Sequence, residues 1–410
     1  MKIAVIGAGI VGLSTANWLK NYGQETVLFD MHEPGSQTSF GNAGTYAQYA
    51  NIPTNSPSFL YLFPYLLLNR NSPLFIQTSH IPKLIPWLFQ FLKNSKRDKV
   101  NDTSNKLTSL LKLIEEGYAD LFKDAKCYDY LTREAVLHVW SNKFFYNAAK
   151  KDFAKRAETG SEISILNKDQ ISDLEPNINN IFCGGALFEG SYFANNPKKV
   201  SESLFNLFLS KGGLFKKEEV LDIIQEGNQI SLKTNESTEQ FDKIVICAGI
   251  WSKNITSKIE ENVPLEAERG YHLMYPELIH TIKRPISWQE RGLYFTPMSN
   301  GLRTAGTVEF AGLSPKKNQR VINFLDRSTR SVFKNAKNPS ESWLGYRPST
   351  PDSIPVIGQS EKNPYIYFCF GHQHVGWTLG GISGKLIAQK MSTNKTDLDL
   401  SPFSIKRFIK

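Results

Sequence analysis

The sequence of 410 residues contains only four cysteines, which lie far apart at positions 127, 183, 247 and 369. Because no two of them form a CxxC pair, nothing suggests a zinc knuckle, a redox pair or a disulfide framework. No stretch reaches the roughly 18 uninterrupted apolar residues of a membrane-spanning helix. Internal repeats are lacking. Because the first motif starts at residue 2, we expect no secretory leader before it. We therefore expect a protein of a reducing, cytoplasmic compartment.

Acidic residues are missing altogether from Pro34 to Arg97. This region combines apolar and aromatic runs at 59–63, 65–68 and 85–92 with six prolines after Pro34, which predict that it is broken into short helices. Its charged residues are all basic. Two interpretations of residues 58–97 remain open: a surface that lies on the inner face of an anionic membrane, or a helical cap packed over an active site.

The formal net charge is +9, from 48 basic and 39 acidic residues. A charge of this size is compatible with nucleic acid, with an anionic membrane surface or with solubility alone. The apolar and charged fractions are ordinary for a globular protein, and the length suffices for two domains with separate cores.

The first thirty residues carry the clearest signal that is present. Residues 2–6 form a short apolar run, Gly7-Ala8-Gly9-Ile10-Val11-Gly12 follows, a helical pattern runs to Gly23, and a second apolar run ends at Asp30. This order of strand, glycine turn, helix and strand predicts a dinucleotide-binding βαβ unit.

Each glycine of the turn has a physical role in such a unit. Gly7 permits the tight turn, Gly9 lets a pyrophosphate approach the backbone, and Gly12 allows the helix to pack close to the sheet. The start of the helix offers free N–H groups to phosphate, and Asp30 is placed to accept hydrogen bonds from ribose hydroxyls.

Further along the chain, two groups of elements are expected. The apolar run at 243–247 should return to the nucleotide-binding sheet as a strand, and residues 166–177 have the pattern of a capped helix. Strands at 270–275, 292–297 and 302–308, followed by a helix near 319–333, predict an antiparallel sheet. The fold class is therefore α/β, a Rossmann-type domain with an inserted α+β domain.

Seven motifs, taken together, resemble the FAD-dependent D-amino acid oxidase superfamily, and within it the bacterial D-amino acid dehydrogenase branch. They are VIGAGIVGLSTA with Asp30, TSFGNAG at 38–44, ICAGIWS at 246–252, ERGYHLMYP at 268–276, TPMSNGLRTAGTVE at 296–309, GYRPSTPDSIPVIG at 345–358 and GHQHVGWTLGGISGKLIA at 371–388. The resemblance covers nearly the whole chain and is weakest at 51–160.

The resemblance implies an FAD-binding domain of residues 1–50, 150–262 and 341–410, and a substrate-binding domain of residues 51–149 and 263–340. The flavin is expected to be noncovalent, since relatives that tether it carry a cysteine just before the TPD triplet, and no cysteine lies between Ser340 and Asp352. The loop from Gly371 would meet the flavin ring, where a helix dipole stabilises negative charge. The residues expected to bind the cofactor are Gly7, Ala8, Gly9, Ile10, Val11, Gly12, Asp30, Thr38, Ser39, Asn42, Ala43, Gly44, Val220, Ala248, Gly249, Trp251, Gly345, Gly371, His372, Val375, Gly376, Trp377 and Thr378.

The chemistry implied by the resemblance is transfer of an amine's α-hydrogen, as hydride, to flavin N5. The resulting imine hydrolyses to a keto acid, or remains cyclic when the donor is a proline derivative. Arg347 matches an arginine that binds the substrate carboxylate, and Tyr294 matches a tyrosine that reaches the same group. A structural salt bridge for Arg347 and a half-buried sheet position for Tyr294 are the alternatives.

His374 departs from relatives that have an arginine or another substrate-facing residue at this position, and its imidazole could contact the substrate. Tyr271 is also expected to act at the substrate, although both Tyr271 and His272 either line the pocket or belong to a sheet core. Arg303 is expected to be structural. His372 and His374 could also bind a metal, but no third ligand is evident and no metal is expected.

Four functions are therefore compared. The leading hypothesis is a dehydrogenase of free D-amino or cyclic imino acids, of D-proline or hydroxyproline type, that passes electrons to a quinone or carrier. The alternatives that keep the fold are a glycine or sarcosine type oxidase and a flavin enzyme of modified tRNA bases. A noncatalytic flavoprotein scaffold is the fourth. The arginine for a free carboxylate argues against an RNA substrate, so no nucleic acid partner is expected.

Overall fold

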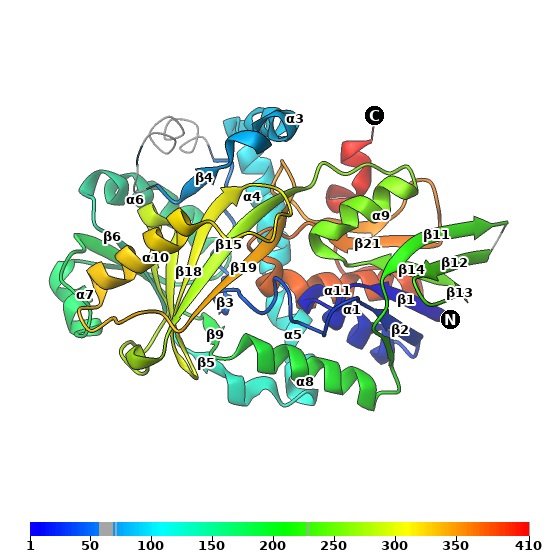
Figure 1. The fold of residues 1–410 in the computed structure, drawn as a ribbon, viewed down its shortest axis with the longest axis horizontal. Coiled ribbons are helices and arrows are strands. Elements are labelled where there is room, and N and C mark those ends of the chain that lie inside the picture. The colour runs from blue at the N-terminus through cyan, green and yellow to red at the C-terminus, as the bar shows by residue number, and fades with distance from the viewer. Residues whose placement is uncertain (57–68, 70–71, 228, 410) are drawn as a thin grey trace.

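The computed structural model describes residues 1–56, 69, 72–227 and 229–409. Two parts, each built on a large β-sheet, lie side by side, with both chain ends in the part on the right of Figure 1. The apolar runs at 59–63 and 65–68 fall outside the described residues. The expected α/β fold is confirmed. The second large sheet, expected to be antiparallel, is mixed: most of its neighbouring strands are antiparallel, but two pairs are parallel.

The first part contains a six-stranded sheet of the described residues, in the order β10-β2-β1-β14-β21-β20. Its strands are β1 Lys2–Ile6, β2 Glu25–Phe29, β10 Leu214–Lys216, β14 Lys243–Ile246, β20 Val356–Gln359 and β21 Ile366–Phe370. All neighbours are parallel except β20 and β21. The expected return of residues 243–247 to this sheet is confirmed, because β14 pairs with β1.

Helices cover one face of this sheet, and a small antiparallel sheet with α9 covers the other. The helices are α1 Ile10–Asn21, α4 Arg97–Leu111, α5 Ile114–Asp124, α8 Pro197–Ser210 and α11 Gly376–Thr393. The other layer consists of β11 Val220–Glu226, β12 Gln229–Thr234, β13 Thr238–Phe241 and α9 Ser252–Lys258. Gly384 lets α11 cross α1 closely, since a Cβ there would lie 2.7 Å from the backbone N of Thr15.

The second part contains a larger sheet in the order β19-β15-β18-β17-β16-β6-β8-β7, with β4 also paired to β18. Its strands are β4 Leu74–Ile76, β6 Val136–Trp140, β7 Ile163–Leu166, β8 Gly184–Phe188, β15 Glu266–Tyr275, β16 Ile286–Trp288, β17 Leu293–Met298, β18 Gly301–Phe310 and β19 Glu341–Ser349. The helix α10, Gln319–Val332, packs on it through Val321, Phe324 and Leu325.

The remaining elements are short or lie around the large sheet. They are α3 Ile81–Lys93, α6 Lys143–Ala157, α7 Lys168–Leu174, the small sheet of β3 Thr45–Tyr46, β5 Leu131–Arg133 and β9 Tyr192–Ala194, and 3₁₀ turns at Thr78–His80, Cys127–Tyr130, Gly249–Trp251, Pro276–Leu278, Gln289–Arg291, Ser401–Phe403 and Ile405–Phe408. A capping box of Asn167 and Gln170 starts α7, inside the capped helix expected at 166–177.

The boundaries between the two parts differ from those expected. Segments 163–188 and 341–349 add strands to the large sheet, whereas α4 and α5, at 97–124, pack into the core of the nucleotide-binding part. Strand pairing joins residues far apart in sequence, and local periodicity does not say which sheet a strand will join.

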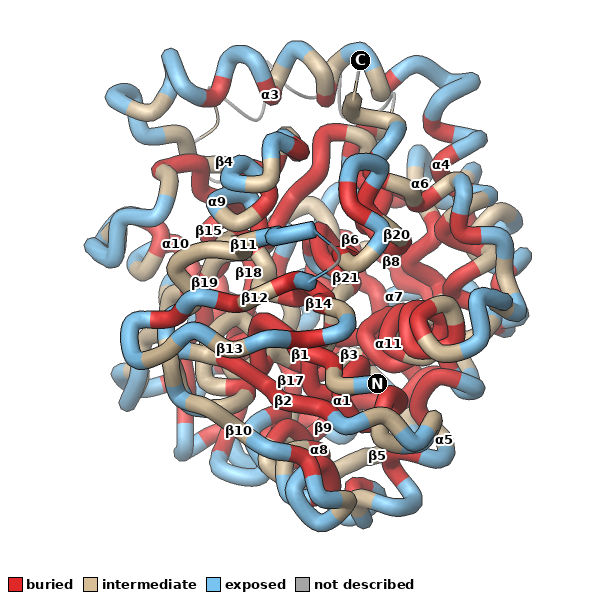
Figure 2. Tube along the Cα trace, turned by 90° about the vertical axis from the view of Figure 1, so that its right-hand side faces the viewer, coloured by how far each residue is buried: buried red, intermediate tan, exposed pale blue. Residues whose placement is uncertain are grey.

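The helix α3 continues through Pro86, where a break was expected. Pro86 removes one backbone hydrogen bond, and the burial of Leu84, Trp87 and Phe91 on one face stabilises the helix in spite of this loss. The opposite face of α3 lies at the surface (Figure 2). Within the described parts of the chain, we find no helix with the length and hydropathy needed to cross a membrane.

Candidate active site

A cavity of about 2300 Å³ runs from the glycine turn after β1 to the large sheet. Pockets for one drug-sized ligand measure about 300 to 1000 Å³. The cavity is therefore large enough for a dinucleotide and a second, smaller molecule together.

Glycines shape the end of the cavity next to β1. Gly7 has a φ of +104°, and a Cβ there would lie 2.6 Å from the carbonyl oxygen of Cys247. A Cβ on Gly12 would lie 1.7 Å from the carbonyl oxygen of Gly7, so α1 packs directly against the turn. Gly9, Ile10 and Val11 border the cavity here. This exposed backbone at a helix start is what the pyrophosphate of FAD requires.

Asp30 and Ser39 fix the backbone around this turn. Asp30 Oδ2 accepts a hydrogen bond from the Ala8 N–H at 2.7 Å, and its Oδ1 accepts one from the His32 N–H at 2.8 Å. Burial raises the pKa of Asp30. Ser39 Oγ accepts a hydrogen bond from the Ile10 N–H at 2.9 Å. Asp30 borders the cavity and retains lone pairs with which it can also accept hydrogen bonds from a ribose.

The loop at 38–44 follows the wall of the cavity and is held by its own side chains. Asn42 bonds to the backbone of Ser39 and Gly44. Arg303 donates to the carbonyl oxygens of Phe40 and Asn42 at 3.0 and 2.9 Å. Burial lowers the pKa of Arg303 to about 10, so it remains a cation whose role is to brace this loop.

The turn before α11 forms the middle of the cavity wall. Gly371 has a φ of +81°, and α11 begins at Gly376, so that its N-terminus borders the cavity. His372 Nε2 lies 2.9 Å from Ser383 Oγ, and burial lowers the pKa of His372 to about 3. A neutral histidine and a helix N-terminus are suited to a flavin ring that gains negative charge.

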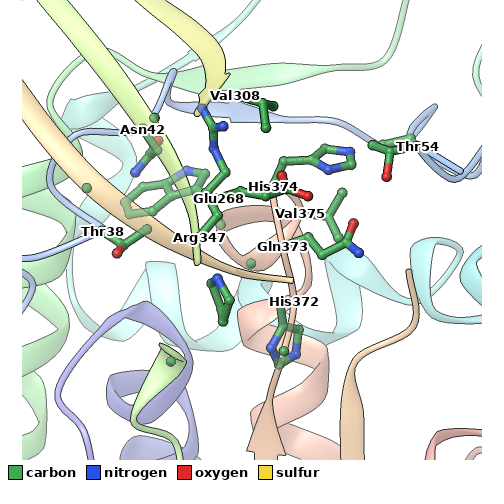
Figure 3. A pocket seen from close by; sticks show the side chains of 18 of the residues that line it. Thr38, Asn42, Thr54, Glu268, Val308, Arg347, His372, Gln373, His374 and Val375 are labelled. Carbon is green, nitrogen blue, oxygen red and sulfur yellow. The ribbon is translucent and has the colours of Figure 1, made fainter. Parts of the chain in front are cut away.

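Arg347 and Glu268 lie beside each other on the neighbouring strands β19 and β15 (Figure 3). Arg347 Nη1 donates to the carbonyl oxygen of Thr307 at 2.7 Å, and no acid of the described residues forms an ion pair with this guanidinium. Gly270 makes room for it, since a Cβ there would lie 2.4 Å from Arg347 Nη2. Burial lowers the pKa of Arg347, and Glu268 partly restores it. Arg347 thus retains donors for a substrate carboxylate.

His374 faces the cavity between two arginines. Its ring is exposed to the cavity, yet protein surrounds it on the other sides, and this burial lowers the pKa of His374 to about 4. The positive charges of Arg347 and Arg156 lower it further. His374 is therefore a neutral imidazole at physiological pH.

Tyr294 belongs to a different group from Arg347. It is half-buried on β17, and its ring lies 6.4 Å from that of His138. Tyr294 borders the same cavity as Tyr49 and as Arg156 of α6, a second arginine.

Tyr271 borders the cavity, but its hydroxyl group is engaged elsewhere. It donates to Glu309 Oε2 and accepts hydrogen bonds from Arg269 and from the Asn318 N–H. The expectation that it acts on a substrate is not supported by these contacts. His272 belongs to the core, as its ring stacks on Trp343 at 5.3 Å.

Nearly all the residues expected from the sequence border this one cavity. The exceptions are Ala8 and Gly12, which lie behind its wall. The wall residues expected from the sequence are Gly7, Gly9, Ile10, Val11, Asp30, Thr38, Ser39, Asn42, Ala43, Gly44, Val220, Ala248, Gly249, Trp251, Tyr271, Tyr294, Gly345, Arg347, Gly371, His372, His374, Val375, Gly376, Trp377 and Thr378. Sequence reasoning missed Arg156, Tyr49 and His138, and it quoted Glu268 only as part of a motif. The described residues bring together no group of three side chains suited to a metal ion.

The buried histidines predict a loss of stability in mild acid. His138, His272 and His372 have lowered pKa values, so between pH 6.5 and 4 the unfolded chain binds protons that the folded protein does not. Stability therefore falls as the pH falls, by about 2 kcal/mol per histidine between pH 7 and 5. In urea unfolding, the free energy of unfolding of His372→Gln should fall by about 2 kcal/mol less between pH 7 and 5 than that of the wild type. An equal fall in the variant and the wild type would contradict the lowered pKa of His372.

Comparisons with known proteins point in one direction. A family model described as FAD dependent oxidoreductase matches residues 2–390. A D-amino-acid oxidase of Bradyrhizobium diazoefficiens is 30% identical over 99% of this chain and 99% of its own length, and a D-amino acid dehydrogenase of the same organism is 23% identical over 100% and 99%. Glycine oxidase from Geobacillus kaustophilus has a similar fold, with a TM-score of 0.79 at 18% identity over 100% and 99% of the two chains. L-proline dehydrogenase from P. horikoshii has a TM-score of 0.77 at 17% identity, over 99% of this chain and 97% of its own.

Proposed function

Because the chain belongs to the DAO family of FAD dependent oxidoreductases, we propose that it dehydrogenates free D-amino acids or cyclic imino acids of D-proline or hydroxyproline type. The enzyme is an FAD-dependent oxidoreductase related to amino acid oxidases and dehydrogenases. The observation that carries the proposal is the half-buried guanidinium of Arg347, which borders the cavity beside Glu268 and whose hydrogen bond within the described residues goes to the carbonyl oxygen of Thr307.

The residues around Arg347 are suited to hold an amino acid in one orientation. FAD, when bound, supplies the acceptor for the hydrogen that leaves the α-carbon as hydride. Arg347 binds the α-carboxylate through two parallel hydrogen bonds, and the neutral His374 beside it contacts the amine or ring. Glu268 lies next to Arg347; burial raises the pKa of Glu268, and the charge of Arg347 lowers it in part. Orientation and exclusion of water are then the main contributions of the protein.

We further propose that the electrons leave to a quinone or carrier at a membrane surface, with α3 as the contact. Ile81, Ile85 and Phe89 lie one helical turn apart on its exposed face, with exposures of 42, 57 and 70%. The other face contributes Leu84, Trp87 and Phe91 to the cavity wall. The absence of acidic residues from 34 to 97 makes an anionic bilayer the matching partner.

Replacing Ile85 and Phe89 by glutamate should weaken binding to vesicles that contain phosphatidylglycerol by about tenfold or more, because two apolar contacts are lost and repulsion is added. Co-sedimentation with vesicles measures this effect. Phe144→Glu is the matched control, since Phe144 is 69% exposed on α6. If both variants bind these vesicles as tightly as the wild type does, α3 is not the surface that contacts the membrane.

Turnover with D and L forms of proline, hydroxyproline and alanine, and with glycine and sarcosine, tests the proposed function. We expect faster turnover with an electron-accepting dye than with oxygen, and a D-amino or imino acid as the best donor. Peroxide formed at the same rate in air would favour the glycine or sarcosine oxidase alternative. Flavin that no amino acid reduces would favour an RNA-base enzyme or a scaffold, the former if binding to RNA falls steeply with salt.

A further inference from the structure

A second polar group borders the cavity around Arg156 of α6 and Tyr294 of β17. Arg156 Nη1 donates to the carbonyl oxygen of Tyr49 at 2.8 Å. The ring of Tyr49 packs edge-on against His138 at 4.8 Å, and His138 lies 6.4 Å from the ring of Tyr294. All four side chains lie on the cavity wall, although they come from different elements.

This group has hydrogen-bonding capacity that the protein does not use. Apart from the bond to Tyr49, Arg156 donates no hydrogen bond within the described parts of the chain, and no acid there lies within 4.0 Å of it. The hydroxyl of Tyr49 and Nε2 of His138 are buried without partners. Such groups cost about 1 to 3 kcal/mol each when they remain unpaired, so they indicate a ligand.

The two arginines of the cavity face a common space. His374 lies close enough to both Arg347 and Arg156 for each charge to lower its pKa. Arg347, His374 and Arg156 all border this one cavity, so a molecule that binds Arg347 with one end can extend within it toward Arg156.

We propose that Arg156 and Tyr294 form a second anchor, which binds an oxygen atom on the substrate's side chain while Arg347 binds the α-carboxylate. This inference rests on the proposed function and narrows its substrate class to amino or imino acids with a side-chain carboxylate or hydroxyl. The guanidinium suits a carboxylate, and its N–H groups can also donate to a hydroxyl oxygen. An apolar side chain would leave the buried donors unpaired.

Two pairs of matched substrates test the second anchor. Glutamate and norvaline differ only in the terminal carboxylate, and cis-4-hydroxyproline and proline differ only in the hydroxyl. We would measure kcat/KM for each in its reactive enantiomer, with the FAD-loaded wild type, Arg156→Gln, Tyr294→Phe and the control Lys150→Gln. Lys150 is an exposed cation of the same helix that does not border the cavity.

We expect the wild type to prefer the oxygen-bearing member of at least one pair by about 10- to 100-fold. The ratio of kcat/KM between the two members of that pair should fall about tenfold in Arg156→Gln and in Tyr294→Phe, and it should stay the same in Lys150→Gln. Because Tyr294→Phe removes only a hydroxyl group, it remains a test of the anchor if Arg156→Gln folds poorly. The pair that shows the preference identifies carboxylate or hydroxyl. If the wild type turns over both members of each pair equally well, or if Arg156→Gln and Tyr294→Phe keep the wild-type ratio, the second anchor is wrong while the proposed function stands. Turnover of none of the four would overturn the proposed function as well.

Discussion

Arg347→Ala is expected to lower kcat/KM for the amino or imino acid by about 10²- to 10³-fold, with FAD still bound. Truncating one partner of a buried, hydrogen-bonded charge pair costs about 2 to 5 kcal/mol. Here the substrate carboxylate loses its partner, and the neighbouring Glu268, whose pKa burial raises, loses the positive charge that lowers that pKa. Stopped-flow reduction of the flavin at several substrate concentrations would separate weaker binding from slower reduction.

Arg347→Lys should recover only a small part of the loss, because an ammonium group keeps the charge but not the planar pair of donors. Arg320→Ala on the exposed face of α10 is the control for removal of a positive charge. A kcat/KM in Arg347→Ala within a factor of three of the wild type would show that the carboxylate binds elsewhere, with Arg156 as the next candidate.

Gly12→Ala is expected to yield a protein without bound FAD. The new Cβ would lie 1.7 Å from the carbonyl oxygen of Gly7, which is backbone and cannot rotate away. The turn or α1 must then move, and the cost exceeds the about 1 to 3 kcal/mol of ordinary overpacking. Flavin absorbance per mole of purified protein, together with the melting temperature, measures both effects.

Gly23→Ala is the matched control, at the end of the same helix. Gly23 has a φ of +71°, but no atom outside its immediate chain neighbours lies within 4 Å of the position that a Cβ would occupy. The substitution should therefore cost about 1 kcal/mol and leave FAD bound. Full flavin content in Gly12→Ala would contradict the close contact between α1 and the glycine turn.

The nucleotide-binding end was predictable because its signals are local. Glycines 7, 9 and 12 follow a strand directly, and the same residues set the geometry of the turn. The capping box of Asn167 and Gln170 is a local signal too. In each case, residues within one short segment determine the structure.

The substrate end was less predictable, because it is assembled from distant segments. Arg156 lies in a basic helix where nothing marks one cation above its neighbours, and only the fold brings it to Tyr294 and His374. Glu268 left a weak signal, an acid in an otherwise buried strand. Tyr271 was expected at the substrate, but Glu309 and Asn318 from later segments engage its hydroxyl group.

Anaerobic reduction of the enzyme-bound flavin is the most direct test of the central claim. We would add D-proline, cis-4-hydroxy-D-proline, D-glutamate and their enantiomers one at a time to the FAD-loaded protein and follow the flavin absorbance without oxygen. We expect bleaching by at least one D-amino or imino acid, and slow or no bleaching by the same acid in Arg347→Ala. Flavin that stays oxidised with every amino and imino acid, in a protein that plainly holds FAD, would contradict the proposed function.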